Sequence, residues 1–301
     1  MFGLKPLLRF PFRRLLIMLT TEEIQFVVLI VFSALSFLLN GTFLIAMSKS
    51  WKIVKRKRIT YHVINLAISD FCVGAGVFCE YLTAVVAERK TTLSLIFSKI
   101  AWMSVLTSLL SVCLMAIERA LCIKKPLTWN TILPMKKIFI IMVGNWVLAL
   151  PLAILMHFYA LKMRIIFVVL FYIPIFLTAL VYINIYIRFS KSNEVDDETQ
   201  HSSSIVARRR NKLMQRKVGN LVLIITLVLV ISMVPTLLAI AVNTTCKLLN
   251  CKFIETVDML TKSFYILSIL NFVVNPILYA WRINLYRQAF WKMFRMVGNE
   301  N

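Results

Sequence analysis

Seven long apolar runs dominate this sequence, and each is close to the length that a helix needs to cross a lipid bilayer. They span approximately residues 23–47, 61–85, 93–122, 137–157, 165–189, 217–242 and 257–281. About 20 apolar residues in a helix cover the hydrocarbon core of a bilayer. Of the 301 residues, 60% are hydrophobic, whereas roughly half is typical of a soluble domain. The sequence therefore predicts an all-α membrane protein, a bundle of seven transmembrane helices.

The chain is expected to divide into three parts, because no repeat and no long soluble domain interrupts the runs. Residues 1–22 would form a short extracellular segment, residues 23–281 the seven-helix domain, and residues 282–301 an amphipathic surface helix with a short cytoplasmic tail. The surface helix is predicted from "RINLYRQAFWKMFR", where apolar residues recur at helical spacing between basic ones. The polar segment 190–216 cannot bury much apolar surface and is expected to be a mobile inner loop.

The net charge of +22 comes from basic residues that lie between the apolar runs rather than in one patch. With the N-terminus outside, the inner side carries clearly more Lys and Arg than the outer side. Transmembrane proteins show this bias toward positive inner loops. The sequence therefore predicts an outer N-terminus and a cytoplasmic C-terminus, and it favours anionic lipids over nucleic acid as the partner of the basic face.

Polar side chains within the runs are candidate functional residues, because they are costly at membrane depth. Asp70 is the only acid deep in any run, and Ser108, Asn271 and Asn275 could turn toward it. Asn271 and Asn275 are four residues apart and so share a helix face. Four oxygen-bearing side chains would suit a small hydrated cation, since hard cations prefer oxygen ligands. Simple interhelical hydrogen bonding is the alternative.

The prolines within the runs include Pro174, Pro235 and Pro276. A proline removes one backbone hydrogen bond and bends a helix. The neighbouring amide of Asn275 and water can satisfy the freed carbonyl. Each proline belongs to a helix that is expected to pack near the polar centre, so the pattern favours a bundle that changes shape.

Several short motifs fall along the runs in the order found in a known family. They are "NLAISD" ending at Asp70, "ERA" from Glu118 to Ala120, Trp146, Pro174 with Tyr182, and "NPILY" from Asn275 to Tyr279. From residue 40 to residue 294 the chain resembles the rhodopsin-like family of G-protein-coupled receptors. The resemblance implies an extracellular ligand, a heterotrimeric G protein, the plasma membrane, and arrestin and receptor kinases as further partners.

The resemblance also assigns roles to residues. Glu118 and Arg119 would hold the inner end of the third helix until activation, when Tyr182 and Tyr279 move toward Arg119. The remaining switch residues would be Met233, Pro235, Asn275 and Pro276. Asp70, Ser108, Asn271 and Asn275 match the family's sodium pocket, with Asp70 as the charged metal ligand. Sodium would be an allosteric modulator, and no other cofactor is expected.

The chain departs from the family pattern at several positions, among them Ala120 in place of a tyrosine and Gln215 in place of an acid. Met233 stands where the family has a tryptophan, and Ser94 replaces the usual cysteine of the third helix. Cys246 and Cys251 lie in the outer loop before the last run, where oxidising conditions favour a disulfide over two free thiols. The missing cysteine, the short second outer loop and this pair are similar to the melanocortin, cannabinoid, lysophospholipid and adenosine receptors.

The expected ligand-binding residues are Glu80, Ala101 and Trp102. Ala101 replaces the aspartate of amine receptors, so a peptide, lipid or nucleoside-like ligand is favoured over a monoamine. Glu80 would contact a cationic ligand group or pair with Lys262 or Arg89 at the rim. A non-receptor transporter is the alternative function, and it would predict inverted repeats. An enzyme is not expected, because the sequence has no paired carboxylates, metal-ligand spacing or nucleophile constellation.

Overall fold

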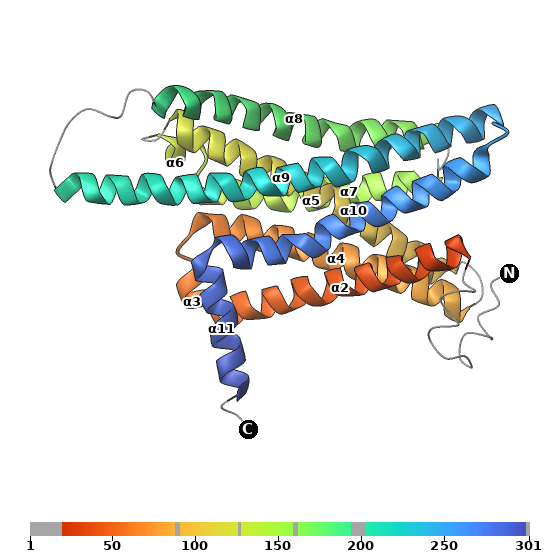
Figure 1. Ribbon diagram of the computed structural model, residues 1–301, viewed down its shortest axis with the longest axis horizontal. Coiled ribbons are helices and arrows are strands. Elements are labelled where there is room, and N and C mark those ends of the chain that lie inside the picture. Colours follow the sequence, from red (N-terminus) through yellow and green to blue (C-terminus); the bar gives the residue numbers. More distant parts are fainter. Residues whose placement is uncertain (1–19, 88–90, 126–127, 159–161, 194–202, 299–301) are drawn as a thin grey trace.

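The computed structural model describes residues 20–87, 91–125, 128–158, 162–193 and 203–298. Seven helices in this part of the chain are long and apolar enough to cross a membrane. They are α2 (Thr21–Lys49), α4 (Arg58–Val86), α5 (Thr92–Lys124), α7 (Met135–Phe158), α8 (Lys162–Asn193), α9 (Ser203–Leu249) and α10 (Ile254–Arg282). The helices run side by side along the long axis of the molecule (Figure 1). The predicted seven-helix bundle is confirmed.

Three further helices lie at one end of the bundle, which we take as its inner end (Figure 1). They are α3 (Trp51–Val54), α6 (Trp129–Ile132) and α11 (Asn284–Gly298). Helix α11 turns away from the bundle directly after α10. Its Tyr286 is fully buried, whereas Trp291 is 64% exposed, as expected for an amphipathic surface helix.

Tyr286 fastens α11 to the bundle. Its ring lies 5.7 Å from the ring of Phe43 in α2, and its hydroxyl donates a hydrogen bond to Thr60 Oγ1 in α4 at 3.1 Å. Burial raises the pKa of the Tyr286 phenol above its usual range, so the hydroxyl keeps the proton that it donates. The anchor fixes where α11 leaves the inner end of the bundle.

Helix α9 is much longer than predicted. Its apolar run was expected over 217–242, but the helix begins at Ser203 and ends at Leu249. The expectation of a mobile loop over 190–216 was therefore wrong at both ends, where α8 and α9 continue, while residues 194–202 lie outside the described part of the chain. The physical reason is that Arg, Lys, Gln and Met are good helix formers, so helical hydrogen bonding does not require an apolar run.

All four prolines within the long helices are followed by further helical turns. Pro174, Pro235 and Pro276 lie inside α8, α9 and α10, and Pro151 lies inside α7. The helices therefore persist at the positions where the sequence predicts bending. Each proline still lacks the backbone donor that its helix would otherwise use.

Helix α5 is the centre of the bundle and packs against α4, α7, α8 and α9. Two glycines of α4 allow its close packing. A Cβ atom on Gly74 would lie 2.5 Å from the Phe37 backbone nitrogen of α2, and one on Gly76 would lie 2.9 Å from the Phe97 carbonyl oxygen of α5. Small residues let transmembrane backbones approach in this way.

Candidate functional site

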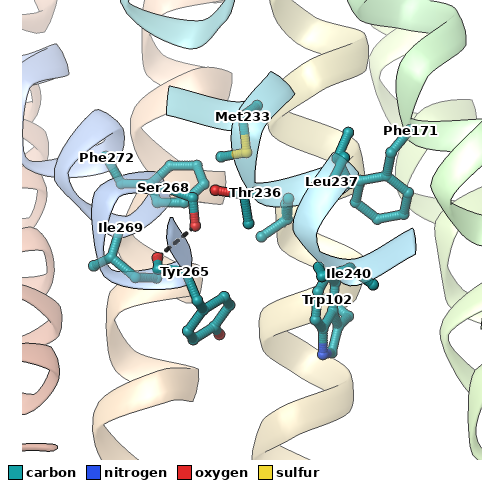
Figure 2. A pocket seen from close by; sticks show the side chains of 11 residues that line it. Trp102, Phe171, Met233, Thr236, Leu237, Ile240, Tyr265, Ser268, Ile269 and Phe272 are labelled. Atoms are coloured by element: carbon teal, nitrogen blue, oxygen red, sulfur yellow. Dashed lines mark hydrogen bonds between the residues drawn. The ribbon is translucent and has the colours of Figure 1, made fainter. Parts of the chain in front are cut away.

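A narrow cavity lies in the outer half of the bundle, among α5, α8, α9 and α10 (Figure 2). Its interior volume is small, about 10 Å³, which is room for about one water molecule. The lining residues are mostly apolar or aromatic, and none carries a charge: Trp102, Val105, Phe171, Met233, Thr236, Leu237, Ile240, Tyr265, Ser268, Ile269 and Phe272. Aromatic and aliphatic walls with a few hydroxyl groups are typical of small-molecule sites.

Two of the hydroxyl groups of the cavity, those of Ser268 and Thr236, already donate to the backbone. Ser268 donates to the carbonyl of Tyr265 at 2.7 Å, as the dashed line in Figure 2 shows. The Thr236 hydroxyl lies 2.6 Å from the Phe264 carbonyl. The ring of Trp102 packs edge-on against Phe171, with the ring centres 5.9 Å apart. These two hydroxyl groups can therefore offer a ligand acceptor lone pairs, while the aromatic walls offer apolar contact.

Only one of the three predicted ligand residues lines this cavity. Trp102 does, but Ala101 is 3% exposed and packs against Gly76 of α4. The expectation that Ala101 contacts the ligand is therefore not supported by its position. The sequence could not indicate this, because neighbouring residues on a helix face different directions and the rotation of α5 is set by its packing against α4.

Glu80 is half-buried on α4, close enough to Tyr265 and Tyr81 to interact electrostatically with both. It thus lies near one wall of the cavity without lining it. Lys262, considered as a partner for Glu80, instead binds Glu22 with Nζ 2.6 Å from Oε1. Arg89 lies outside the described residues.

The predicted polar cluster around Asp70 forms in the middle of the bundle. Asp70 is fully buried, and Ser108 Oγ donates to its Oδ1 at 2.8 Å. Asn275 Nδ2 donates to its Oδ2 at 2.7 Å. Asn271 is 1% exposed, and neither of its amide atoms has a hydrogen-bond partner among the described residues. Three helices, α4, α5 and α10, thus meet at one carboxylate.

The residues of this cluster fit a small, hard cation. The buried amide oxygens of Asn271 and Asn275 have no hydrogen-bond donor in the described part of the chain, and an unsatisfied buried acceptor is costly. Together with the Asp70 carboxylate and Ser108 Oγ they make an oxygen-only ligand set. Within that part of the chain no group of three or more His, Cys, Asp or Glu could hold a metal. The fit therefore rests on one carboxylate and neutral oxygens.

Two polar side chains of α2 bind the backbones of α4 and α10 next to this cluster. Asn40 is fully buried, and its Nδ2 donates to the carbonyl of Phe272 in α10 at 2.9 Å. Ser36 donates to the backbone carbonyl of Asp70 at 3.1 Å. Side chains of α2 therefore contact the backbone of α4 at Asp70 and the backbone of α10 at Phe272.

A second polar group lies on α4 and joins it to α5 and α7. Asn65 Nδ2 donates to Ser111 Oγ at 2.7 Å, and Trp146 Nε1 donates to Asn65 Oδ1 at 3.1 Å. Buried amide groups need such hydrogen-bond partners. The tryptophan that contributed to the resemblance therefore acts as a hydrogen-bond donor to α4.

At the inner end of α5, Glu118 contacts the side chains of two arginines and one histidine. Arg58 Nε lies 3.1 Å from Oε1, His62 Nε2 lies 2.6 Å from Oε2, and Arg119 Nη2 lies 3.5 Å from Oε1. Glu118 and His62 have fully buried side chains. The longest of the three contacts is the one to Arg119, so the expected Glu118–Arg119 pair is present but shared.

Arg58 and His62 were missed by the sequence analysis. They lie four residues apart and hence on one face of α4. A buried carboxylate also requires compensating charge. Those two facts together could have identified α4 as a source of partners for Glu118.

The two tyrosines predicted to act in the switch are buried near the inner half of the bundle. Tyr182 is 6% exposed and interacts electrostatically with Arg119. The Tyr279 ring packs 5.3 Å from the ring of Phe43. Neither hydroxyl has a hydrogen-bond partner in the described part of the chain. Both phenols are therefore available for new hydrogen bonds if the helices rearrange.

The predicted disulfide is not formed in the structure, where Cys246 and Cys251 are free thiols. The two residues are nevertheless close. The Cys251 N–H donates to the Cys246 carbonyl at 3.0 Å, and the side chains also interact by a hydrogen bond. Asn250 adopts a left-handed backbone with φ of 52°, which closes this tight turn. The disulfide stays a prediction.

Most of the sequence matches a known protein family. The model for the 7 transmembrane receptor (rhodopsin family) matches residues 39–165 and 161–279. These segments include the Asp70 cluster, the Glu118 group and the cavity. No curated protein matches the chain.

Proposed function

Because the chain belongs to the rhodopsin family of seven-transmembrane receptors, it is a multi-pass membrane receptor, and we propose that an extracellular ligand makes it activate a heterotrimeric G protein. The N-terminal segment would lie outside the plasma membrane and α11 at its cytoplasmic face. This orientation places the cavity on the side of the ligand and Arg119 on the side of the G protein. The family match also removes the ground for the transporter alternative.

The main support for G-protein coupling is that Arg119 is buried but only partly paired. The residue is 8% exposed at the inner end of α5, and its Nε has no hydrogen-bond partner among the described residues. Its ion pair with Glu118 is long, at 3.5 Å. A guanidinium has five N–H donors, so Arg119 retains donors for a partner that enters from the inner side.

Met233 and Pro235 provide a route from the cavity to the inner half. Met233 lines the cavity and lies at the opposite end from Trp102 in Figure 2. A ligand that displaces this flexible thioether would press on α9 two residues before Pro235. The missing backbone hydrogen bond lowers the cost of bending α9 there. Movement of α9 would open the inner end beside Arg119.

The Asp70 cluster would set the balance between the closed arrangement of the helices and the arrangement in which the inner end is open. Asp70, Ser108, Asn271 and Asn275 would hold a sodium ion, whose charge would offset the buried carboxylate. Asn275 is followed by Pro276 in α10, so the cluster includes the helix that carries Tyr279. Residues that close around a cation here would stabilise the arrangement in which Tyr279 remains packed against Phe43.

The cavity supports a mainly apolar ligand. Its walls carry no charge, and the hydroxyl groups of Ser268 and Thr236 donate to the backbone. A monoamine would bring an ammonium group that no lining carboxylate neutralises, which is costly. Of the classes that the sequence favours, a lipid-like molecule fits this lining better than a nucleoside with many hydrogen-bonding groups.

Cyclic-AMP and calcium measurements in cells that express the chain test this function. Cells that express the chain should give a stronger signal than empty cells, either without ligand or when the lipid ligands of a panel are added. The panel should include peptides and nucleosides, so that the ligand classes are compared directly. Normal surface expression without a response to any ligand, in every G-protein pathway measured, would contradict the proposal.

A further inference from the structure

The carboxylate of Glu118 is held mainly from another helix. His62 Nε2 lies 2.6 Å from Oε2, and Arg58 Nε lies 3.1 Å from Oε1, whereas Arg119 lies 3.5 Å from Oε1. Both shorter contacts come from α4. Arg58 and Arg119 share one oxygen, and His62 has the other to itself. The position of Glu118 therefore depends on His62 more than on its neighbour in α5.

Arg58 is itself fixed by the second inner loop. Its guanidinium lies 4.4 Å from the ring centre of Trp129 and donates to Asn130 Oδ1 and to the Leu133 carbonyl. These groups belong to α6 and the residue that follows it. A guanidinium with three such partners cannot follow Glu118 if the carboxylate turns away. Arg58 of α4 is therefore already held in the position from which it contacts Glu118.

We propose that His62 is a positioning residue that keeps Glu118 turned toward α4, and thereby leaves Arg119 available to bind the G protein. This inference rests on the proposed coupling function. Glu118 has one negative charge, and three side chains compete for it. Each contact that holds the carboxylate on α4 weakens its pair with Arg119. Without His62, Oε2 would be free to turn toward Arg119 and complete a two-oxygen pair with the guanidinium.

Substitution of His62 separates this role from packing. In His62→Phe the ring volume is kept but the N–H is lost. In His62→Gln the side chain retains an N–H donor that can reach Glu118. The full-length receptor would be purified in nanodiscs, and its affinity for a nucleotide-free G protein measured without ligand. We expect the affinity of His62→Phe to fall about tenfold, the effect of one charge-assisted contact, and that of His62→Gln to recover most of the loss.

The Glu118→Gln background provides the decisive control. Removing the carboxylate charge ends the competition, so His62→Phe should change the affinity little when Glu118 is already Gln. An unchanged affinity in His62→Phe alone would overturn the inference. An equal loss of affinity in His62→Gln and His62→Phe would also overturn it. The same holds if His62→Phe loses as much affinity with Gln at position 118 as with Glu118, since either result indicates that His62 acts through packing. If His62→Phe does not fold, His62→Met, which also lacks a donor, replaces it.

The same measurement distinguishes this inference from the proposed function. If the wild-type receptor binds none of the G-protein classes and Arg119→Ala behaves identically, coupling itself is contradicted. If the wild type binds and Arg119→Ala does not, coupling stands, and the His62 variants alone decide the role of His62.

Discussion

At the residue scale, two buried carboxylates differ in their partners. Asp70 accepts hydrogen bonds from the neutral groups of Ser108 and Asn275, whereas Glu118 contacts the cationic side chains of Arg58 and Arg119. A buried charge that has only neutral partners is costly. Asp70 therefore has a reason to bind a cation, and Glu118 has its charge already offset by protein groups.

Asp70→Asn is predicted to remove the stabilising effect of sodium. The purified receptor should unfold at a higher temperature in sodium chloride than in choline chloride. The stabilisation would be about 1.4 kcal/mol when sodium is about tenfold above its dissociation constant. Asn keeps the shape of Asp70 but has no charge, so the two salts should then give equal unfolding temperatures. A sodium effect of the same size in Asp70→Asn would leave the cluster as hydrogen bonding alone.

Glu80→Gln is predicted to lower the affinity of an agonist that carries a cationic group by about tenfold, the effect of one charge-assisted hydrogen bond. Glu80 is half-buried near Tyr265, which lines the cavity. Agonist binding would be measured on cells with matched surface expression. Glu22→Gln is the control, because Glu22 pairs with Lys262 at the outer end of α2. Equal affinity in both variants would exclude a ligand role for Glu80.

At the scale of elements, α4 links the outer, middle and inner parts of the site. It carries Asp70, Asn65 and the Arg58–His62 pair, which contact α5 at successive levels. Its other face lies against α2 through Gly74. The spacing between α4 and its neighbours is therefore part of the geometry of every polar contact.

Gly74→Ala is predicted to lower the free energy of unfolding by about 1–3 kcal/mol, since overpacking forces backbone shifts. The added Cβ would meet backbone atoms of α2, at 2.5 Å from Phe37 N and 2.8 Å from Ser33 O. Gly144→Ala in α7 is the matched control, because no atom lies within 4 Å of its added Cβ. Thermal unfolding of both purified variants would measure the difference. Equal stability of the two would show that α2 and α4 can separate without cost.

The turn between α9 and α10 is predicted to close by a disulfide between Cys246 and Cys251 on the oxidising outer side. The loop is short, so the link should add only about 2 kcal/mol to stability. Peptide mapping by mass spectrometry without reduction should recover the two cysteines in one linked peptide. Detection of both as free thiols in receptor from the cell surface would contradict the disulfide.

At the scale of the whole molecule, the structure places an apolar cavity, a buried polar cluster and a partly paired arginine along one bundle. The cavity and the Asp70 cluster share α5 and α10, and the cluster and the Glu118 group share α4 and α5. A change of shape in α4 or α10 must therefore affect two of the three sites, and one in α5 must affect all three.

Arg119→Ala is predicted to reach the cell surface and to lose its G-protein signal about tenfold or more, because a partner loses its charge-assisted hydrogen bonds to the guanidinium. Cyclic-AMP and calcium responses would be compared with those of Lys124→Ala. Lys124 is exposed near the end of the same helix, so it controls for loss of one inner positive charge. Signalling of Arg119→Ala at the wild-type level would contradict its role in coupling.

The sequence by itself determined the number of membrane spans, the approximate ends of most of them, and Ser108 and Asn275 as partners of Asp70. Hydropathy depends on composition within about 20 residues, so it needs no knowledge of the fold. A buried charge requires polar partners, and each apolar run contains few polar residues. For that reason Ser108 and Asn275 could be grouped with Asp70. The same argument applied to Glu118 was incomplete, since only Arg119 was considered.

Only the tertiary structure decided which faces of the helices meet. The rotation of α5 buries Ala101 against Gly76 and turns Trp102 toward the cavity, although the two residues are adjacent in the chain. The packing of α4 brings His62 to Glu118 across 56 positions of sequence, from 62 to 118. Such contacts depend on how whole helices rotate and approach, which is settled by the sum of many side-chain contacts between them and cannot be found in any single run.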